Sequence, residues 1–384
     1  MCGYTMRNTL MSRRVVASSA TAVAMRAVCA LSAVALSACT LQRAQPHSAG
    51  LKSSAVDDHM AHMNAADLSA PMGASRDATQ QGTPGIPASN VTAAARLKAS
   101  PRHSEWVKIA STPGAADSIM AWVVYPASPN SRAKAPVVVV VHEIFGLSTW
   151  VRAVADQVAA DGFIAVAPDF LSRVRGGPSS VELPSDTARA LIGGVNAAEK
   201  NAVISAAANY AMMLPSAQQK YAVIGYCWGG TASFGHAVNG GVKGFSAAVP
   251  FYGAPYMAAG TPATATTAAV PATVSADSLA RIKVPVMLLS GSKDARIGAA
   301  MPAIDSIMTS MKKEYSGTNY EGAIHGFLRA QNDPITQPQG RVGGPPPTPR
   351  TAEDMQTEQA ANLAAAKDGW PKTIAFLKKN LGVK

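Results

Sequence analysis

The chain contains a cysteine between glycines at the end of an apolar run, a pattern that few folds accommodate. Residues 225–230 read GYCWGG and directly follow the apolar residues 221–224. A sharp turn from a buried strand into a helix raises one side chain above the edge of a parallel sheet, and small flanking residues permit the strained backbone. The side chain raised here is the thiol of Cys227. A buried cysteine that lies between glycines by chance has the same local sequence, so the assignment depends on the rest of the chain.

The partners that a nucleophilic cysteine needs occur downstream in the order acid, then histidine, as in α/β-hydrolases. Only His236 and His325 follow Cys227. His236 falls within the helical pattern after the turn, whereas His325 lies in a loop after the strand-like residues 315–320. Asp294 lies in the loop that leaves the preceding apolar run. An isolated Asp or His in such a loop is usually a turn or surface residue, but the order of all three predicts a Cys-His-Asp triad.

Short apolar runs alternate with helical patterns throughout residues 103–384. This alternation favours a mainly parallel sheet with helices on both faces, whose catalytic groups gather at the carboxyl ends of the strands. The sequence therefore predicts a single α/β domain of the α/β-hydrolase type. Gly369 and Pro371 predict a break in the last helix. Strands are expected near residues 120–125, 136–142, 163–167, 221–226, 246–252, 284–290 and 315–321, and helices near residues 148–161, 195–213, 228–239, 299–312 and 352–380.

An acidic residue, Glu143, comes shortly after the valine run at residues 137–141. A carboxylate at the end of a buried strand needs a partner, because burying an unpaired charge is costly. With this residue included, the chain resembles the dienelactone hydrolase family, the carboxymethylenebutenolidases. The resemblance spans about residues 103–384, and the matching stretches are residues 142–146 (HEIFG), 167–170 (APDF), 225–230 (GYCWGG), 251–253 (FYG), 291–294 (GSKD) and 325–329 (HGFLR).

The resemblance implies a role for each matched side chain. Cys227 would be the nucleophile, His325 the base, and Asp294 the group that orients the base. Glu143 would contact the resting thiol, and Arg329 would bind a carboxylate of the substrate. The family uses a second carboxylate-binding arginine that has no matching motif here, and its candidates are Arg173, Arg175 and Arg189.

The expected reaction is acyl transfer through the cysteine. A thiolate attacks a carbonyl carbon, and backbone N–H groups hold the resulting oxyanion. The residues that follow the acid and the nucleophile, Ile144 and Trp228, are the expected donors. A carboxylate beside the thiol disfavours its ionisation, so Glu143 predicts a neutral thiol until an anionic ester arrives. Water activated by His325 would then release the acyl-thioester.

The first 38 residues predict an export signal. Four arginines are the only charged residues before residue 40, and the apolar run 27–38 precedes Cys39. This pattern is typical of a signal peptide and resembles a bacterial lipoprotein signal with a lipid on Cys39. A plain secretory signal is the alternative, and the export route stays open. The run is shorter than the roughly 20 residues that a spanning helix needs.

The residues after the predicted signal favour a tethered periplasmic enzyme. Residues 39–102 are rich in Ala, Ser, Thr, Pro and Gly, a composition that predicts a flexible linker between the membrane anchor and the enzyme. Two later low-complexity segments, residues 257–278 and 334–349, are expected to be surface insertions; the first either caps the active site or is inert, and the second interpretation is favoured. The oligomeric state is not defined by the sequence, and a monomer is expected.

The net charge limits the classes of partner. The whole chain carries +11, and without the predicted signal thirty basic and twenty-three acidic residues remain. This excess favours anionic substrates or a membrane surface. No dense basic run with interleaved aromatic residues predicts nucleic-acid binding. No motif predicts a cofactor or a metal site.

Three functions are compatible with these patterns. The first is a cysteine hydrolase that acts on a small anionic ester or lactone. The second is a general esterase or thioesterase on the same fold with a different acyl pocket. The third is a non-catalytic envelope lipoprotein with a binding role, which is disfavoured because every catalytic position is filled.

Overall fold

The computed structural model describes residues 82–110, 117–127, 134–179, 183–258, 273–333 and 350–383. The predicted signal peptide, Cys39, the first part of the predicted linker and the whole predicted insertion at residues 334–349 lie outside the described residues. Every helix within the described ranges is too short or too polar to cross a lipid bilayer.

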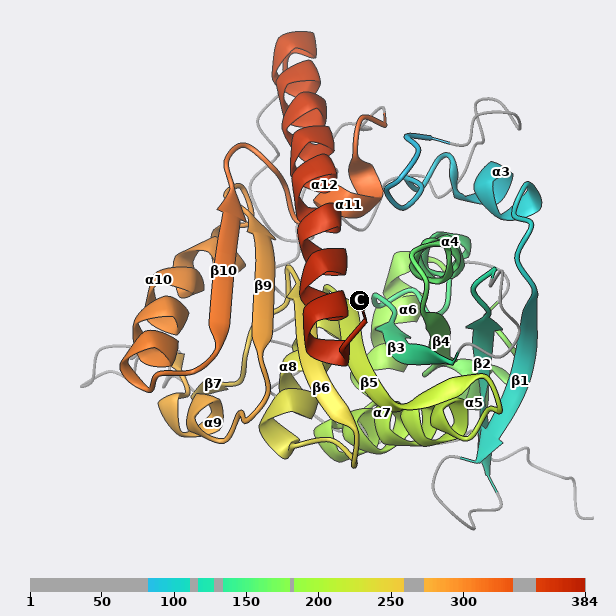
Figure 1. Ribbon diagram of the computed structural model, residues 1–384. Coiled ribbons are helices and arrows are strands. Elements are labelled where there is room, and N and C mark those ends of the chain that lie inside the picture. Colours follow the sequence, from blue (N-terminus) through green and yellow to red (C-terminus); the bar gives the residue numbers. More distant parts are fainter. Residues whose placement is uncertain are drawn as a thin grey trace, which may run out of the picture. The chain divides into compact units, whose positions relative to one another are not determined.

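Eight strands form one sheet in the order β1-β2-β4-β3-β5-β6-β9-β10 (Figure 1). The pairs β1–β2 and β2–β4 are antiparallel, and every other neighbouring pair is parallel. The predicted α/β-hydrolase fold with a mainly parallel sheet is confirmed. The strands are β1 Ser104–Ala110, β2 Ser118–Val124, β3 Ala135–Val141, β4 Ile164–Asp169, β5 Ala217–Tyr226, β6 Phe245–Phe251, β9 Val286–Gly291 and β10 Tyr315–Tyr320.

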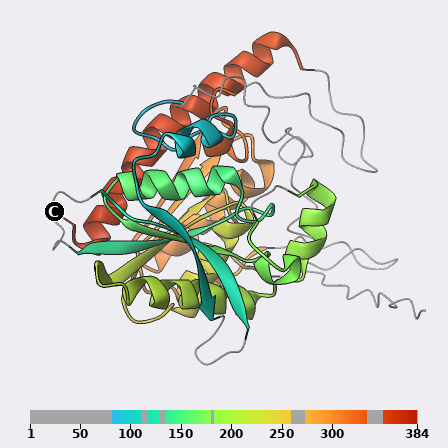
Figure 2. The same ribbon diagram turned by 90° about the vertical axis from the view of Figure 1, so that its right-hand side faces the viewer.

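Helices cover both faces of the sheet. Figure 2 shows α4 and α12 on one side and α7 on the other, where α8 also packs against β5 and β6. The helices are α3 Ala93–Lys98, α4 Thr149–Ala160, α5 Ser172–Arg175, α6 Ser185–Gly193, α7 Ala197–Met212, α8 Trp228–Asn239, α9 Ala276–Ala280, α10 Ala295–Ser310, α11 Phe327–Ala330 and α12 Ala352–Leu381.

The centre of the sheet places the ends of two strands side by side. The sequence of β3 is APVVVVV, and all its valines are fully buried, as expected for a parallel strand covered by helices on both faces. In the register between β3 and β5, Val141 pairs with Gly225. The segments that follow these two residues therefore leave the same edge of the sheet, and they carry Glu143 and Cys227.

The prediction of a flexible linker is wrong for residues 82–102, which fold against the domain. This segment contains α3, and Ile86, Ala88 and Ala93 are buried. Its alanine-rich composition resembles a linker, but its backbone groups find hydrogen-bond partners on the domain. The edge strand β1 was also not predicted, because its residues are mostly half-buried and mixed in polarity.

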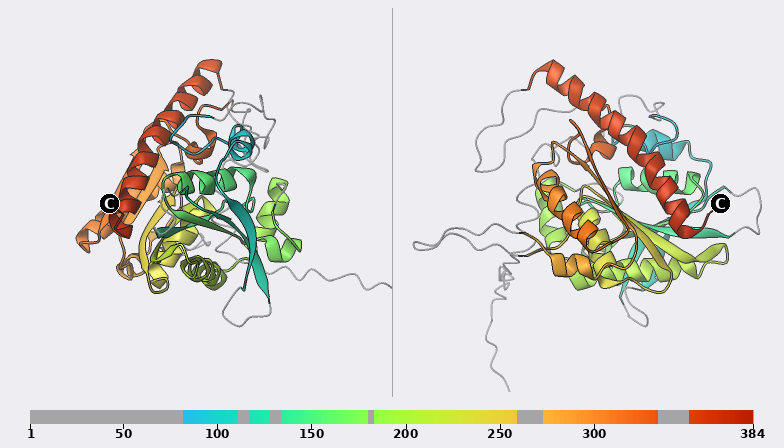
Figure 3. Two further views of the ribbon diagram at one scale, coloured as in Figure 1. Left: turned by 45° about the vertical axis from the view of Figure 1, so that its right-hand side comes forward. Right: turned by 60° about the vertical axis from the view of Figure 1, so that its left-hand side comes forward.

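The predicted break in the last helix is also wrong. The helix α12 is continuous over 30 residues with Pro371 in its interior (Figure 3). A proline inside a helix removes one backbone hydrogen bond. The stripe of Trp370, Ile374 and Leu377 is buried, and this burial outweighs the lost bond. Gly369 packs closely on Tyr320, where an added Cβ would lie 3.1 Å from the phenol oxygen, so this glycine serves packing rather than termination.

The ends of the predicted insertion at residues 257–278 are joined by a small antiparallel pair. The strands β7 Met257–Ala258 and β8 Thr273–Val274 form a separate two-stranded sheet. The residues between them lie outside the described part of the chain. After β8 the chain continues through α9 into β9, and Asp294 follows the end of β9.

Candidate active site

Cys227 lies at the sharp turn between β5 and α8. Its φ is 56° and its ψ is −115°, a conformation that is strained for any residue except glycine. The flanking glycines have a different role from the one expected, because they allow close packing. A Cβ on Gly225 would lie 2.0 Å from the carbonyl oxygen of Gly229, and a Cβ on Gly229 would lie 2.4 Å from that of Val141. Any larger residue at either position would force the turn apart.

Asp294 and His325 form a direct contact. Asp294 is the N-cap of α10, and its Oδ1 accepts a hydrogen bond from the backbone N–H of Ile297 at 3.3 Å. Its Oδ2 lies 2.5 Å from Nδ1 of His325. Both side chains are buried. One oxygen therefore fixes the carboxylate to the helix, and the other fixes the orientation of the imidazole.

The pKa values of Asp294 and His325 reflect their mutual interaction and, for His325, the nearby sulfur. Burial alone would lower the pKa of His325, but the charge of Asp294 and the interaction with Cys227 raise it well above its usual value. Burial alone would raise the pKa of Asp294, but the charge and hydrogen bond of His325 hold it below its usual value. The imidazole thus interacts with the carboxylate on one side and the sulfur on the other. The structure brings Asp294 and His325 into contact, and the Cys-His-Asp triad itself stays a prediction.

Glu143 and Arg329 form a buried ion pair at the same edge of the sheet. The Nε atom of Arg329, on α11, lies 3.6 Å from Oε2 of Glu143, and both side chains are less than a tenth exposed. The guanidinium also lies 5.5 Å from the ring centroid of Phe145. The partner that the buried carboxylate needs is therefore Arg329. The direct contact between Glu143 and the thiol that the resemblance implies stays a prediction.

The two expected oxyanion donors lie on neighbouring segments. Trp228 is the first residue of α8, and the first N–H groups of a helix have no acceptor within the helix. They also lie at the positive end of the helix dipole. Ile144 follows β3, and the β3 segment contacts the turn through the backbone of Gly229. This arrangement suits stabilisation of a negative oxygen next to Cys227.

His142 supports this region, a role that the sequence did not reveal. The backbone N–H of Phe170 donates to its Nε2 at 3.0 Å, so Nδ1 carries the proton and donates to the backbone oxygen of Glu143 at 2.5 Å. Burial lowers the pKa of His142, and the charge of Asp169 offsets only part of this effect, so the ring stays neutral. The ring also stacks on Trp228 with centroids 5.9 Å apart. His142 thereby links the Glu143 loop to the turn at Cys227.

Two buried tyrosines also face this group. Tyr226 and Tyr252 are fully buried, and their hydroxyl oxygens have no hydrogen-bond partner among the described residues. Burial and the charge of Glu143 raise the pKa of both phenols well above the usual value. The positive charge of Arg329 partly offsets this effect at Tyr252. A tyrosine in an apolar strand looks like a core residue in the sequence, so no local signal identified these hydroxyls as donors available to a ligand.

The second carboxylate-binding cation stays a prediction. Arg173 is exposed on α5 and forms ion pairs with Asp117 at 2.9 Å and Glu199 at 3.0 Å. The structure shows a further cation, Lys200, whose Nζ lies 4.8 Å from the ring centroid of Trp228. Burial lowers the pKa of this lysine to about 8. Of the other two candidates, Arg175 ends α5 and Arg189 lies within α6.

His236 is a buried helix residue, as the sequence indicated. It lies in α8, and its Nε2 is 2.8 Å from the hydroxyl of Tyr221 while its Nδ1 is 2.7 Å from Oδ1 of Asn201. Oδ1 of Asn201 accepts from Nδ1, so Nε2 carries no proton and accepts from the hydroxyl of Tyr221, which itself accepts from the N–H of Val242. Burial lowers the pKa of His236 to about 3. The ring is therefore neutral and structural.

Acid is expected to destabilise the protein through His236. Its pKa is about 3 in the folded state against 6.5 for an ordinary histidine, so unfolding takes up a proton between these values. The free energy of unfolding should therefore fall as the pH falls from about 6.5 to 3, by at most about 1.4 kcal/mol per pH unit for this group. Urea unfolding at several pH values should give a shallower slope for His236→Gln. An identical slope in both proteins would contradict this assignment.

Comparisons with known proteins agree with the geometry. The family model described as the dienelactone hydrolase family matches residues 120–381. A protein from Synechocystis sp. with the provisional name carboxymethylenebutenolidase is 30% identical over 210 residues, which cover 53% of this chain and 80% of the relative. The carboxymethylenebutenolidase of Pseudomonas putida is 31% identical over 126 residues, 32% of this chain and 52% of the relative. For several relatives the match thus spans about half of their length.

The fold comparison leads to the same group of proteins. The crystal structure of a provisionally named dienelactone hydrolase from Klebsiella pneumoniae aligns with a TM-score of 0.50 and 22% identity. The alignment covers 72% of this chain and 99% of that protein. The identity is low enough that this likeness supports the fold alone, while the family model supports the assignment itself. The chain belongs to the dienelactone hydrolase family and is a hydrolase that acts on carboxylic esters.

Proposed function

We propose that this chain cleaves a small carboxylate-bearing ester or lactone through Cys227 and an acyl-thioester intermediate. The observation that carries the proposal is the line of contacts from Asp294 through His325 to Cys227, beside the buried pair of Glu143 and Arg329. A nucleophile, a base and a cation for an anionic substrate are thus combined at one edge of the sheet.

In the first half of the reaction, the proton of the thiol moves to Nε2 of His325, because Nδ1 is bound to Asp294. The sulfur attacks the carbonyl carbon, a C–S bond forms, and the carbonyl electron pair moves onto the oxygen. The N–H groups of Ile144 and Trp228 stabilise this oxyanion. The oxyanion then collapses, the C–O bond to the leaving group breaks, and His325 returns the proton to the leaving oxygen.

In the second half, water hydrolyses the thioester. The neutral His325 takes a proton from the water, and the resulting hydroxide attacks the same carbon. The second oxyanion occupies the same place as the first. Its collapse breaks the C–S bond and releases the carboxylic acid product, which loses its proton to water, and the sulfur of Cys227 regains its proton from the imidazolium. The positive end of α8 stabilises the negative sulfur in both halves.

The ion pair gives the reaction its preference for anions. A substrate carboxylate that binds Arg329 must take the place of Glu143, which lies 3.6 Å from the guanidinium. The charge-assisted hydrogen bond between Arg329 and the substrate carboxylate then replaces the ion pair between Arg329 and Glu143. The displaced Glu143 can then accept the proton of the thiol or hydrogen-bond to the free hydroxyls of Tyr226 and Tyr252. A neutral ester has no group that replaces Glu143 at the guanidinium.

Arg329→Met is expected to lower kcat/KM for a carboxylate-bearing aryl ester roughly 10- to 100-fold, the contribution of a hydrogen bond to a charged group. The rate on the matched neutral methyl ester should change far less. Steady-state rates on both esters give the test. Because the variant leaves Glu143 buried without its cation, the double variant Arg329→Met, Glu143→Gln is the control for folding. Equal losses on both esters would contradict the role of Arg329.

The same ester panel separates the alternatives. A general esterase or thioesterase would turn over neutral and anionic esters at similar rates. A non-catalytic binding protein would let iodoacetamide label Cys227 but would turn over none of the esters. The proposal requires both a reactive thiol and a preference for the anionic ester.

A further inference from the structure

Residues 82–98 form an N-terminal arm that lies outside the region matched by the family model, which begins at residue 120. The arm includes α3 and lies beside α11 and over α4 (Figures 1 and 2). Its residues Ile86, Ala88, Ser89 and Ala93 are almost fully buried. The segment is therefore packed into the domain although it precedes the region matched by the family model.

One end of the arm holds the helix that carries Arg329. The backbone N–H of Asn90 donates to the backbone oxygen of Arg329 at 2.9 Å. The Nε2 atom of Gln331 donates to the backbone oxygen of Pro87 at 2.7 Å and to that of Leu328 at 3.0 Å. Gln331 is buried with a φ of 42°, a strained conformation that persists only where the surroundings fix it. The arm supplies part of that restraint.

A carboxylate strengthens the same junction. Oδ1 of Asp333 accepts from the hydroxyl of Ser89 at 2.7 Å, and Oδ2 accepts from the backbone N–H of Val91 at 3.0 Å. The positive charge of Arg329 also acts on this carboxylate. Asp333 therefore ties the residues just after α11 to two nearby residues of the arm, Ser89 and Val91.

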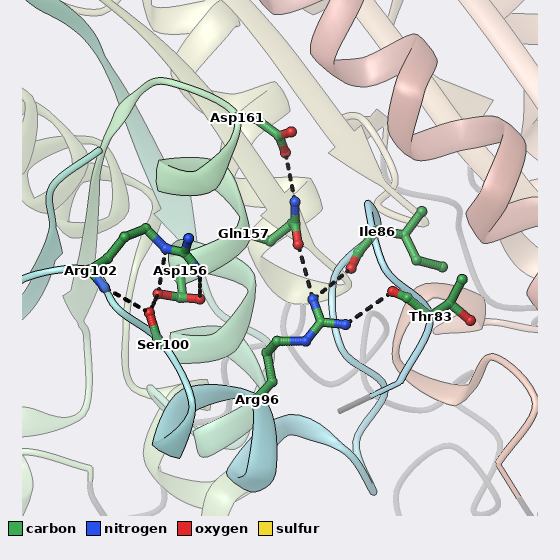
Figure 4. A network of polar contacts seen from close by, with 8 residues as sticks. All are labelled: Thr83, Ile86, Arg96, Ser100, Arg102, Asp156, Gln157 and Asp161. Atoms are coloured by element: carbon green, nitrogen blue, oxygen red, sulfur yellow. Dashed lines mark hydrogen bonds and ion pairs between the residues drawn. The ribbon is translucent and has the colours of Figure 1, made fainter. Parts of the chain in front are cut away.

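The other contacts of the arm anchor it to α4, the helix that follows the Glu143 loop. The indole Nε1 of Trp150 donates to the backbone oxygen of Ala88 at 3.0 Å. Arg96 donates to the side chain of Gln157 at 3.1 Å and to the backbone oxygen of Ile86 at 3.2 Å (Figure 4). The arm thus connects α4, which follows the Glu143 loop, with α11, which carries Arg329.

Helix α11 depends on such contacts for its orientation. It has four residues, and a single helical turn is not stable by itself because nucleation is unfavourable. Helix α12 supports the preceding loop, where Oδ1 of Asn362 accepts from the N–H of Ile324 at 3.0 Å, next to His325. The arm supports the following part, at Arg329. Two different elements therefore position the base and the substrate-binding cation.

We propose that the N-terminal arm is a specificity element, which fixes Arg329 against Glu143 and so sets the preference for a carboxylate-bearing ester. The inference rests on the proposed function of Arg329. Ser89, Gln331 and Asp333 act as positioning residues, since they hold the helix rather than the substrate. Loosening the arm lets α11 move, which weakens the binding of the substrate carboxylate and leaves the chemistry at Cys227 unchanged.

The test compares two serines that make the same kind of bond. Ser89→Ala removes the hydrogen bond to Asp333 next to α11, and Ser100→Ala removes a hydrogen bond of 2.5 Å to Asp156 on α4. In Ser89→Ala, KM for the anionic ester should rise roughly threefold to tenfold, because one buried hydrogen bond is lost. The kcat for this ester and the kcat/KM for the neutral ester should not change. Ser100→Ala should leave the ratio of kcat/KM for the anionic ester to kcat/KM for the neutral ester unchanged. A loss of thermal stability in both variants with unchanged ratios would overturn the proposal.

A second measurement does not depend on turnover. Hydrogen exchange reports the opening of α11 through the amides of Ala330 and Gln331, which bond to Gly326 and Phe327. Their protection should fall in Ser89→Ala and stay unchanged in Ser100→Ala, and equal protection in both variants would overturn the role of the arm. If the wild-type protein turned over no ester, the proposed function would fail. The exchange result would then still decide whether the arm fixes this helix.

Discussion

Cys227→Ala should abolish ester hydrolysis and leave the fold intact. The variant removes only the sulfur, and alanine tolerates the strained backbone at this turn as well as cysteine does. Loss of the nucleophile should reduce kcat roughly 10⁴- to 10⁶-fold, as for other enzymes that form a covalent intermediate. Rates on the carboxylate-bearing aryl ester and thermal unfolding by circular dichroism give the two measurements. Turnover above about one per cent of the wild-type rate would remove the nucleophile assignment.

Cys227→Ser is the matched control for this result. The two side chains differ in one atom, so packing in the buried site is preserved. A hydroxyl ionises far less readily than a thiol, so much less of the attacking anion forms at serine. The serine variant should therefore retain weak activity, well below wild type but above Cys227→Ala. Full activity with serine would show that thiolate chemistry is not used.

Asp294→Asn should lower kcat roughly 10³- to 10⁴-fold while the protein stays folded. The asparagine oxygen can still accept from the N–H of Ile297 and cap α10, which turns the amide NH₂ toward Nδ1 of His325. Nδ1 must then accept a hydrogen bond, so the proton sits on Nε2. This tautomer cannot take the proton of the Cys227 thiol. Asp277→Asn, in an exposed part of α9, is the control for the change in charge.

The same variant should shift the titration of His325. The charge of Asp294 is the main influence that raises this pKa, so its removal should lower it, a change that NMR of labelled histidine detects. In the wild type, the raised pKa of His325 stabilises the fold at pH values below that of an ordinary histidine, and this stabilisation is lost as the pH rises through the raised value. The lowered pKa of Asp294 stabilises the fold at pH values above the usual pKa of an aspartate. This stabilisation is lost as the pH falls through the lowered pKa. An unchanged histidine titration in Asp294→Asn would contradict the pairing.

Much of the site was predictable because its signals are local. The glycines on both sides of Cys227, the apolar run before them and the loops that carry Asp294 and His325 lie within a few residues of a strand end. In a parallel sheet, such ends share one edge whatever the distance along the chain. The order of the triad and the strand positions therefore follow from the pattern, as do the boundaries of α8.

Other features depend on contacts between distant residues, which no local pattern encodes. The Glu143–Arg329 pair and the donors at Tyr226 and Tyr252 exist only because separate segments converge. The uninterrupted course of α12 through Pro371 depends on the surface that buries its apolar stripe.

The thiol turn and the order of acid and histidine, on which the proposed chemistry rests, could be predicted from the sequence because they lie in local motifs. Only the folded chain shows that Arg329 is the cation beside Glu143 and that the N-terminal arm contacts its helix. The arm shows the physical reason, since its alanine-rich sequence has little hydrophobic signal. Its order comes from backbone groups such as the oxygen of Ala88 and the N–H of Asn90, which find partners on Trp150 and Arg329. Every residue except proline carries the same backbone donor and acceptor, so only their positions in the folded chain reveal whether they are satisfied.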